Sequence, residues 1–330
     1  MRLSVLDQAP VTIGNTAKDA LKKAEELAIL TDKLGYVRMW MAEHHGEKSF
    51  ASSAPEVTAA HLAAKTKNMR IGTGGVMMMH YSPLKLAEVC KTLSAFSPGR
   101  IDFGLGRAPG GDTHAMYALS EGRQLMMDNM YTKFDTALKL INDEVPEDPL
   151  YDKTIAVPSQ IVLPEAWLLG SSGSSALKAA EMGVGYAFAQ FFNGAMSKQI
   201  LDTYKNNFQP SVFMDKPEIN ATFIVTTAET KEEAEFEALP QDLFRLMMMK
   251  GQNIQLLTPE EAQNVSLTEI DRMQIKENRK LHLVGAVKDV ATILQEEQEK
   301  YGFDEAMIFS IPHSQEKRLE VYRLLARELI

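Results

Sequence analysis

The segment with the most evident chemistry in this sequence runs from Ile101 to Asp112 and reads IDFGLGRAPGGD. Its apolar residues alternate as in a short strand, and its glycines are too closely spaced for a helix. Arg107 therefore follows a strand end, where its guanidinium could bind a phosphate bidentately while the glycines expose backbone N–H groups. An ordinary surface arginine on a loop between a strand and a helix is the alternative.

A serine-rich segment after another predicted strand, residues 166–170, offers a second set of anion-binding groups. Gly170, Ser171 and Ser172 open the run GSSGSS, which leads into a predicted helix. Backbone N–H groups and hydroxyls at a helix N-terminus bind anions, although serines there also serve as helix caps. The two roles are compatible, and together with Arg107 these residues predict a two-sided phosphate site.

A glycine pair, Gly74 and Gly75, ends the predicted strand 69–73. Because the pair carries no side chains, a flat ring could rest against its backbone. A loop that simply requires a positive φ is the alternative. The neighbouring methionines 77–79 could face a ligand, but methionines more often belong to a core.

Two adjacent histidines, His44 and His45, follow the predicted strand 37–41. Adjacent side chains of an extended segment point in opposite directions, so the pair cannot serve one metal. The sequence has a single cysteine, Cys90, and no helical His-x-x-x-His pair, so we expect no metal site. One imidazole could act as a general base or hold a reactive oxygen adduct. A structural histidine hydrogen-bonded to the opposite wall is the alternative.

Alternating strands and helices must bring these segments together. The apolar patterns predict eight strands, at 3–6, 37–41, 69–73, 101–107, 166–170, 185–189, 219–227 and 305–309. The predicted helices include 16–34, 55–67, 83–96 and a long one over 113–142. This order predicts an α/β fold, a (β/α)8 TIM barrel forming a single domain over 1–330, with its site at the C-terminal strand ends. Residues 239–283 break the alternation, and we expect an extended insertion after strand seven that acts as a mobile lid.

Composition limits the classes of function. The 330 residues are 45% hydrophobic and 24% charged, which suits one large globular barrel. The net charge of −9 argues against nucleic acid or an anionic membrane as a partner. The N-terminus shows no signal-peptide pattern and no apolar run approaches the roughly 18 residues of a membrane span, so we expect a cytoplasmic protein.

Four motifs, taken in order, resemble those of the luciferase-like monooxygenases, in particular the flavin-dependent oxidoreductases of unassigned substrate. They are AEHH at 42–45, IGTGGV at 71–76, SPGRIDFGLGRAPG at 97–110 and LLGSS at 168–172, and the resemblance covers essentially the whole chain. It implies a barrel that binds reduced flavin mononucleotide (FMN) supplied by a separate NAD(P)H:flavin reductase. The flavin would react with O2 at C4a, and the resulting C4a-peroxyflavin would oxidise a small organic substrate.

The resemblance also implies individual roles. His44 would act on the flavin peroxide or the substrate, and Gly74 and Gly75 would be joined by a cis peptide bond under the flavin ring. Arg107 would bind the flavin phosphate, and Ser171 and Ser172 would complete the phosphate site. The protein would be a homodimer that pairs through helices 55–67 and 83–96.

Two positions depart from bacterial luciferase itself. Gly106 stands where the luciferase α subunit has a cysteine beside the flavin, and Ser171 stands where it has an acidic residue. The first change leaves more room on one flavin face, so luminescence is not to be assumed. The second makes the phosphate loop less acidic and does not threaten binding.

The sequence leaves the substrate and two other classes of protein open. Possible lining residues at the barrel mouth suit an aldehyde, a ketone or another hydrophobic molecule: Met78, His80, Gln190, Phe191 and Phe192. One alternative is an oxidoreductase that uses the deazaflavin F420. Its cofactor carries a polyglutamate tail and usually meets several basic residues at the mouth, where this sequence offers Arg107 alone. A non-catalytic flavin-binding protein would be expected to lose His44 or the regular barrel order.

Overall fold

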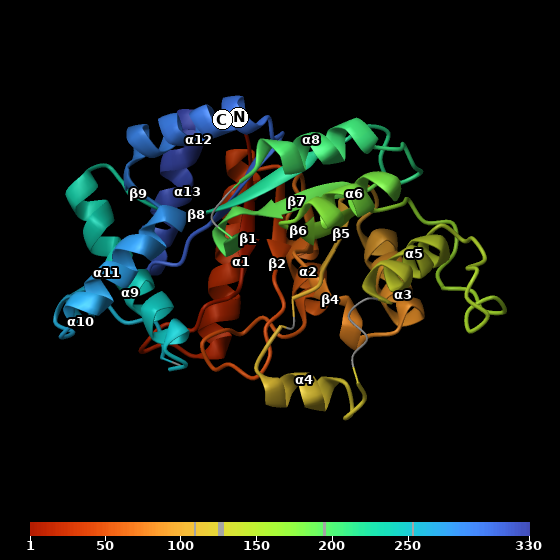
Figure 1. Cartoon of the computed structure of the whole chain (residues 1–330), viewed down its shortest axis with the longest axis horizontal. Coiled ribbons are helices and arrows are strands. Elements are labelled where there is room, and N and C mark those ends of the chain that lie inside the picture. The colour runs from red at the N-terminus through yellow and green to blue at the C-terminus, as the bar shows by residue number, and fades with distance from the viewer. Residues whose placement is uncertain (109, 125–128, 194–195, 253) are drawn as a thin grey trace.

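Parallel strands and surrounding helices make up the computed structural model, which describes residues 1–330 except 109, 125–128, 194–195 and 253 (Figure 1). Strands β1, β2, β3, β5, β6, β7 and β8 pair in that order, and β10 pairs with both β8 and β1, which closes an eight-stranded barrel. Its strands are β1 (Arg2–Asp7), β2 (Arg38–Met41), β3 (Arg70–Thr73), β5 (Ile101–Gly106), β6 (Glu165–Gly170), β7 (Gly185–Ala189), β8 (Ile219–Ala228) and β10 (Glu305–Phe309). The predicted TIM-barrel fold is confirmed.

Two further strands lie outside this closed set. The short β4 (Val76–Met77) pairs with β5. Strand β9 (His282–Ala286) pairs with the second half of β8, beyond the point where β7 ends. Strand β9 was not predicted from the sequence, because its residues fall at the edge of a region that lacks the regular alternation.

Helices cover the outside of the barrel. They are α1 (Ala17–Leu34), α2 (Pro55–Lys65), α3 (Pro83–Phe96), α4 (Thr113–Leu119), α5 (Met130–Ile141), α6 (Gly173–Glu181), α7 (Gln190–Asn193), α8 (Lys198–Asn207), α9 (Lys231–Met249), α10 (Pro259–Gln263), α11 (Glu269–Asn278), α12 (Val287–Tyr301) and α13 (Gln315–Leu329), with 3-10 turns η1 (Met78–His80) and η3 (Arg279–Leu281). Among the described residues, no helix combines the length and apolar character that a membrane span requires.

Local sequence signals explain several helix boundaries. Thr16 and Asp19 form a reciprocal capping box at the start of α1, and Gly35 ends the helix with a φ of 89°. Pro83 occupies the first turn of α3, where its missing N–H costs nothing. The single helix expected over 113–142 is wrong, because α4 ends at Leu119 and a turn with positive φ at Glu121 and Gly122 follows.

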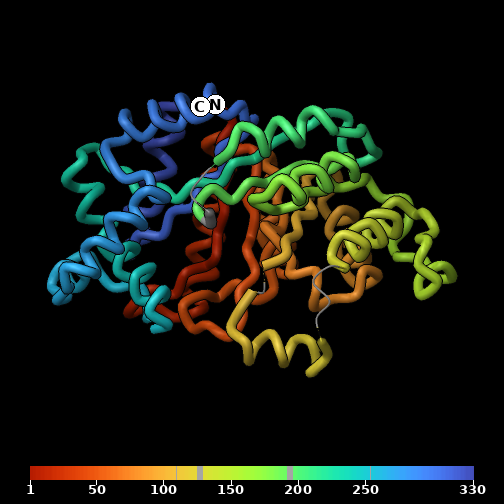
Figure 2. Tube along the Cα trace, in the orientation of Figure 1, coloured from red at the N-terminus to blue at the C-terminus, as the bar shows by residue number. Residues whose placement is uncertain are grey.

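The two ends of the barrel differ in chemistry. Both chain termini lie side by side at one end, where the Met1 amino group donates to the Leu329 carbonyl at 2.7 Å (Figure 2). The glycine-rich loop after β5 leads to α4, which lies at the opposite end of the molecule (Figure 1). The C-terminal strand ends, here called the mouth, therefore face away from the termini.

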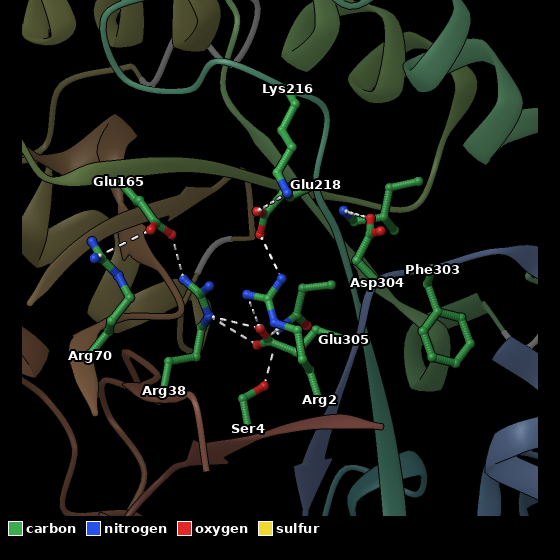
Figure 3. A network of polar contacts seen from close by, with 12 residues as sticks. Arg2, Ser4, Arg38, Arg70, Glu165, Lys216, Glu218, Phe303, Asp304 and Glu305 are labelled. Atoms are coloured by element: carbon green, nitrogen blue, oxygen red, sulfur yellow. Dashed lines mark hydrogen bonds and ion pairs between the residues drawn. The ribbon is translucent and has the colours of Figure 1, made fainter. Parts of the chain in front are cut away.

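Buried ion pairs fill the barrel interior near the strand starts (Figure 3). The fully buried Arg38 donates to Glu305 at 2.9 Å, to Asp102 at 2.8 Å and to Glu165 at 2.9 Å. Burial alone would lower the pKa of Arg38, but these carboxylates hold it above its ordinary value. Side chains at this end of such barrels serve stability, so the chemistry is to be sought at the mouth.

Candidate active site

The strand pairing brings the predicted phosphate-binding residues together at the mouth. Strands β5 and β6 pair in parallel, and the last pair is Leu105 opposite Leu168. If the register is extended by two residues, Arg107, just past the end of β5, comes level with Gly170. The loop after β5 and the N-terminus of α6 are therefore neighbours, as the sequence predicted.

Arg107 is exposed, and within the described part of the chain no hydrogen bond or ion pair engages its guanidinium. The residue before it is Gly106, where the one atom of the described residues within 4 Å of an added Cβ is the Leu169 Cβ, at 3.6 Å. Protein packing thus does not demand a glycine at this position. An unpaired cation beside open space fits a phosphate-bearing ligand.

The serines at the start of α6 serve as a helix cap and leave the helix end accessible. Ser172 and Ser175 form a capping box, so the capping interpretation of the serines is confirmed. At Gly170 an added Cβ would lie 2.3 Å from the Ser175 Oγ, whereas at Gly173 it would meet nothing within 4 Å. The open side at Gly173 leaves room for an anion at the helix N-terminus.

Gly74 and Gly75 are joined by a cis peptide bond, as the resemblance implied. Neither glycine has a positive φ, so the alternative of a loop that simply requires a positive φ is wrong. Gly72 pairs with Asp102 of β5, and Val76 pairs with Leu105, so the segment between β3 and β4 has one residue more than the facing segment of β5. The glycine pair therefore lies in a bulge. An added Cβ would come within 2.8 Å of the Trp40 Cβ at Gly74 and of the Leu105 Cα at Gly75. Both positions therefore require glycine.

His44 lies just past β2, largely buried, with its ring stacked on Phe50 at a centroid distance of 4.5 Å. Burial, assisted by the neighbouring His45, lowers the pKa of His44 to about 4. At neutral pH the imidazole is therefore neutral and a weak base, with one ring nitrogen that accepts a hydrogen bond and one N–H that donates one. The expectation that it could both take and give a proton near pH 7 is corrected accordingly.

Glu43 is a buried carboxylate whose role was not predicted from the sequence. Its Oε1 accepts hydrogen bonds from the His45 Nε2 at 2.7 Å and the Tyr81 hydroxyl at 2.6 Å, and its Oε2 accepts from the Met77 backbone N–H at 2.8 Å. Burial and the Glu43 carboxylate raise the pKa of Tyr81 well above its usual range. Glu43 thus ties the segment after β2 to β4 and to the residue following η1.

The same network reaches the arginine loop. The His45 backbone N–H donates to the Gly110 carbonyl at 2.6 Å, and His45 forms a parallel bridge with Gly111. An added Cβ at Gly111 would lie 2.5 Å from the His45 carbonyl oxygen. His45 therefore braces the loop that carries Arg107, while His44 faces Phe50.

The insertion that follows β8 contacts the rim of the mouth. The Ile13 N–H donates to the Leu256 carbonyl at 2.9 Å, and the Ser49 hydroxyl donates to the Ile254 carbonyl at 2.9 Å. Phe244 of α9 meets Phe50 edge to face at 5.9 Å. Three contacts thus connect the insertion to the loops after β1 and β2, beside His44.

Two recesses flank this region. One of about 430 Å³ lies between the loop after β2 and the insertion, lined by Gly46, Lys48, Ser49, Ile254 and Gln255. Another, of about 520 Å³, lies between α9, α11 and β9, and none of the predicted site residues lines it. The chemistry at the strand ends, rather than cavity size, therefore locates the site.

The expected lining of the mouth is only partly right. Phe191 belongs to the apolar cluster inside the barrel and lies 6.1 Å from the Phe309 ring. Met78 is instead fully buried in the core between barrel and helices, so its assignment to the mouth is wrong. Gln190 is the first residue of α7, directly after β7, and His80 is the last residue of η1, with its ring beside that of Tyr81. The side chain of Phe192 lies outside the described residues.

Known proteins resemble this chain over most of its length. A family model described as luciferase-like monooxygenase matches residues 1–307. N-acetyl-S-alkylcysteine monooxygenase of Bacillus subtilis is 32% identical over 329 residues, which cover 99% of this chain and 97% of that protein.

Two solved structures extend the comparison. The crystal structure of apo-MsnO8 superposes with a TM-score of 0.89 and 34% identity, over 99% of this chain and 98% of the other. The oxygenating component of 3,6-diketocamphane monooxygenase from Pseudomonas putida, a type II Baeyer–Villiger monooxygenase in complex with FMN, superposes with a TM-score of 0.70. At 17% identity, over 100% and 98% of the two chains, this second likeness shows a shared fold.

Proposed function

The chain belongs to the luciferase-like monooxygenase family, and from this premise we propose that it is a flavin-dependent monooxygenase that uses reduced FMN and O2 to oxidise a small hydrophobic substrate. Aldehydes and ketones are the substrates we favour. The observation that carries the proposal is the exposed Arg107 guanidinium, unpaired within the described chain and level with Gly170 at the start of the α6 loop. This donor set fits a phosphate monoester such as that of FMN.

Each residue at the mouth has a stated task in this proposal. Arg107 and the loop of Ser171 and Ser172 bind the flavin phosphate, and the backbone of Gly74 and Gly75 supports the ring. Because the Ser172 N–H donates to the Ser175 hydroxyl at 3.2 Å, the exposed first turn of α6, at Gly173 and Ser174, supplies the backbone N–H groups. When bound, reduced FMN supplies two electrons to O2, so that one oxygen atom enters the substrate and the other leaves as water. His44, neutral at pH 7, hydrogen-bonds the substrate or the oxygen species and is a weak base toward the substrate.

The choice of FMN is supported by a solved structure of the same fold, and its source is what the resemblance to the luciferase-like monooxygenases implies. The fold is shared with an FMN complex of a type II Baeyer–Villiger monooxygenase. A separate NAD(P)H:flavin reductase would deliver reduced FMN by diffusion. The relative that oxidises N-acetyl-S-alkylcysteines adds thioethers to the substrates worth testing.

Isotope incorporation tests the proposal. Purified protein receives photoreduced FMN and ¹⁸O2 with a panel of aldehydes, ketones and thioethers. We expect FMN-dependent product that contains one ¹⁸O atom, made in excess over a catalase-treated control without protein. Turnover of a ketone or alcohol with F420 and without O2, and no ¹⁸O incorporation with reduced FMN, would contradict it.

A further inference from the structure

Helix α9 crosses part of the mouth and places Arg245 there. Phe244 meets Phe50, in the loop after β2, and the Arg245 guanidinium donates to the Phe191 carbonyl, just after β7, at 3.3 Å. In the closed order of the barrel, β2 and β7 are diametrically opposite. The Phe244–Arg245 pair therefore lies between opposite walls of the mouth.

Arg245 is poorly satisfied at this position. A guanidinium carries five N–H donors, yet the 3.3 Å contact with the Phe191 carbonyl is the one hydrogen bond it makes to the described residues. The side chain is half-buried, and burial lowers the pKa of Arg245, with Asp242 opposing this effect. A partly desolvated cation with spare donors calls for a partner, because burying such groups unpaired costs free energy.

The nearby acidic residue does not provide that partner. Both carboxylate oxygens of Asp242 accept hydrogen bonds from Arg279, at 2.7, 2.7 and 2.6 Å. Arg279 also pairs with Glu235 at 3.1 Å, and His282, whose pKa burial lowers, faces Asp242 at 3.7 Å. The hydrogen-bonding capacity of Asp242 is thus largely committed to Arg279. Asp242 still attracts the Arg245 charge, but no carboxylate of the described residues forms an ion pair with Arg245.

Among the described residues, aromatic rings also lie beside Arg245. Phe244 and Phe309 belong to the apolar cluster inside the barrel, and the partly buried Phe50 and Phe191 pack against it. A ligand that satisfies both the guanidinium and these rings must join an apolar body to an anionic end. We propose that Arg245 binds a carboxylate of the substrate, so that the substrate class is a small apolar carboxylic acid. This inference rests on the proposed function, which it deepens.

Matched acid and amide probes test the inference by binding alone. Octanoate and octanamide share a chain length and differ in charge, and their affinities are measured by calorimetry on the flavin-free protein. We expect wild type to prefer octanoate by about 10- to 100-fold, the range for a hydrogen bond to a charged group. Arg245→Met should abolish this preference and Arg245→Lys should keep part of it. Equal affinities in wild type, or an unchanged preference in Arg245→Met, would overturn the inference.

Control variants distinguish a substrate carboxylate site from a flavin phosphate site and from general surface charge. Arg272→Met removes an exposed arginine of the same insertion and should keep the octanoate preference. Loss of FMN affinity in Arg245→Met, with riboflavin affinity unchanged, would assign the arginine to the flavin phosphate and overturn the inference. An Arg245-dependent octanoate preference in a protein that binds no reduced flavin would refute the proposed function and leave the carboxylate site standing.

Discussion

At the scale of single residues, burial sets the chemistry that His44 can perform. The ring is stacked on Phe50, and its pKa of about 4 leaves it uncharged throughout the neutral range. An uncharged imidazole beside the support expected for the flavin ring can act as a base or a hydrogen-bond acceptor.

Replacing His44 should separate chemistry from folding. His44→Ala should retain flavin affinity while substrate oxidation falls about 10²- to 10⁴-fold, the usual value of a positioned acid–base group. His45→Ala, which releases the Glu43 carboxylate, should lower thermal stability more than turnover. Product formation and melting temperature are measured on both variants. Normal turnover in His44→Ala would show that the residue is structural.

The same pKa shift predicts a pH dependence of stability. His44 titrates near pH 4 in the folded protein and near 6.5 when unfolded, so its protonation favours unfolding. The stability of the folded protein is unaffected by His44 protonation above pH 6.5, and it falls as the pH is lowered from 6.5 toward 4. At pH 5 the loss should reach about 2 kcal/mol. Urea unfolding at pH 7 and pH 5 should show this extra loss in wild type and not in His44→Phe; equal losses in both would contradict the shift.

The residue types at the site were largely predictable from the sequence, and their partners were not. Arg107 and the glycine pair stand out because few ordinary loops combine such residues at strand ends. Glu43 does not stand out, because Tyr81, whose hydroxyl donates to it, is distant in the sequence. Arg245 lies in the insertion, whose path across the mouth is set by tertiary contacts that leave no local pattern.

At the scale of elements, the sequence predicted helix and strand boundaries well where residues such as proline and glycine mark them. The predicted helix over Pro83–Phe96 matches α3 because a proline begins it and Ser97-Pro-Gly99 ends it. The turn at Glu121 and Gly122 was missed, since an apolar helical pattern continues on both sides. Strand β9 was missed because its pairing with β8 is long-range.

The insertion should respond to ligand. We expect residues 239–283 to be mobile without ligand and to close over the flavin, since the bound oxygen species must be kept from water. Trypsin should cut first after the exposed Lys250, and reduced FMN with a substrate should slow this cut. Cleavage after the exposed Lys153, in the loop before β6, serves as the control and should be unaffected. Rapid cleavage elsewhere with the insertion spared would contradict the lid.

At the scale of the whole molecule, the family resemblance predicts pairing through α2 and α3. Helix α3 carries apolar residues at helical spacing, Leu86, Val89 and Leu93, which could have formed the contact. They do not support it, because Leu86 and Leu93 are buried in the core of the same chain and Val89 packs against that core. Two large apolar side chains on these helices are exposed: Val57 on α2, 66% exposed, and Phe96 at the end of α3, 81% exposed. They are the residues that a dimer through these helices would cover.

Sedimentation equilibrium at micromolar concentration should therefore give twice the chain mass. The double variant Val57→Asp, Phe96→Asp should shift the mass toward one chain by placing charge in the contact. Ile270→Asp, which changes an exposed apolar residue of α11, should leave the mass unchanged. A wild-type mass near one chain would refute the dimer.

The central claim is that the mouth binds reduced FMN by its phosphate, and one comparison tests it most directly. Affinities for reduced FMN and reduced riboflavin are measured anaerobically on wild type, Arg107→Met and the control Arg123→Met, another exposed arginine. We expect Arg107→Met to weaken FMN binding by about 1.5–3 kcal/mol and to leave riboflavin binding unchanged. Arg123→Met should match wild type. Equal FMN affinity in wild type and Arg107→Met would contradict the account.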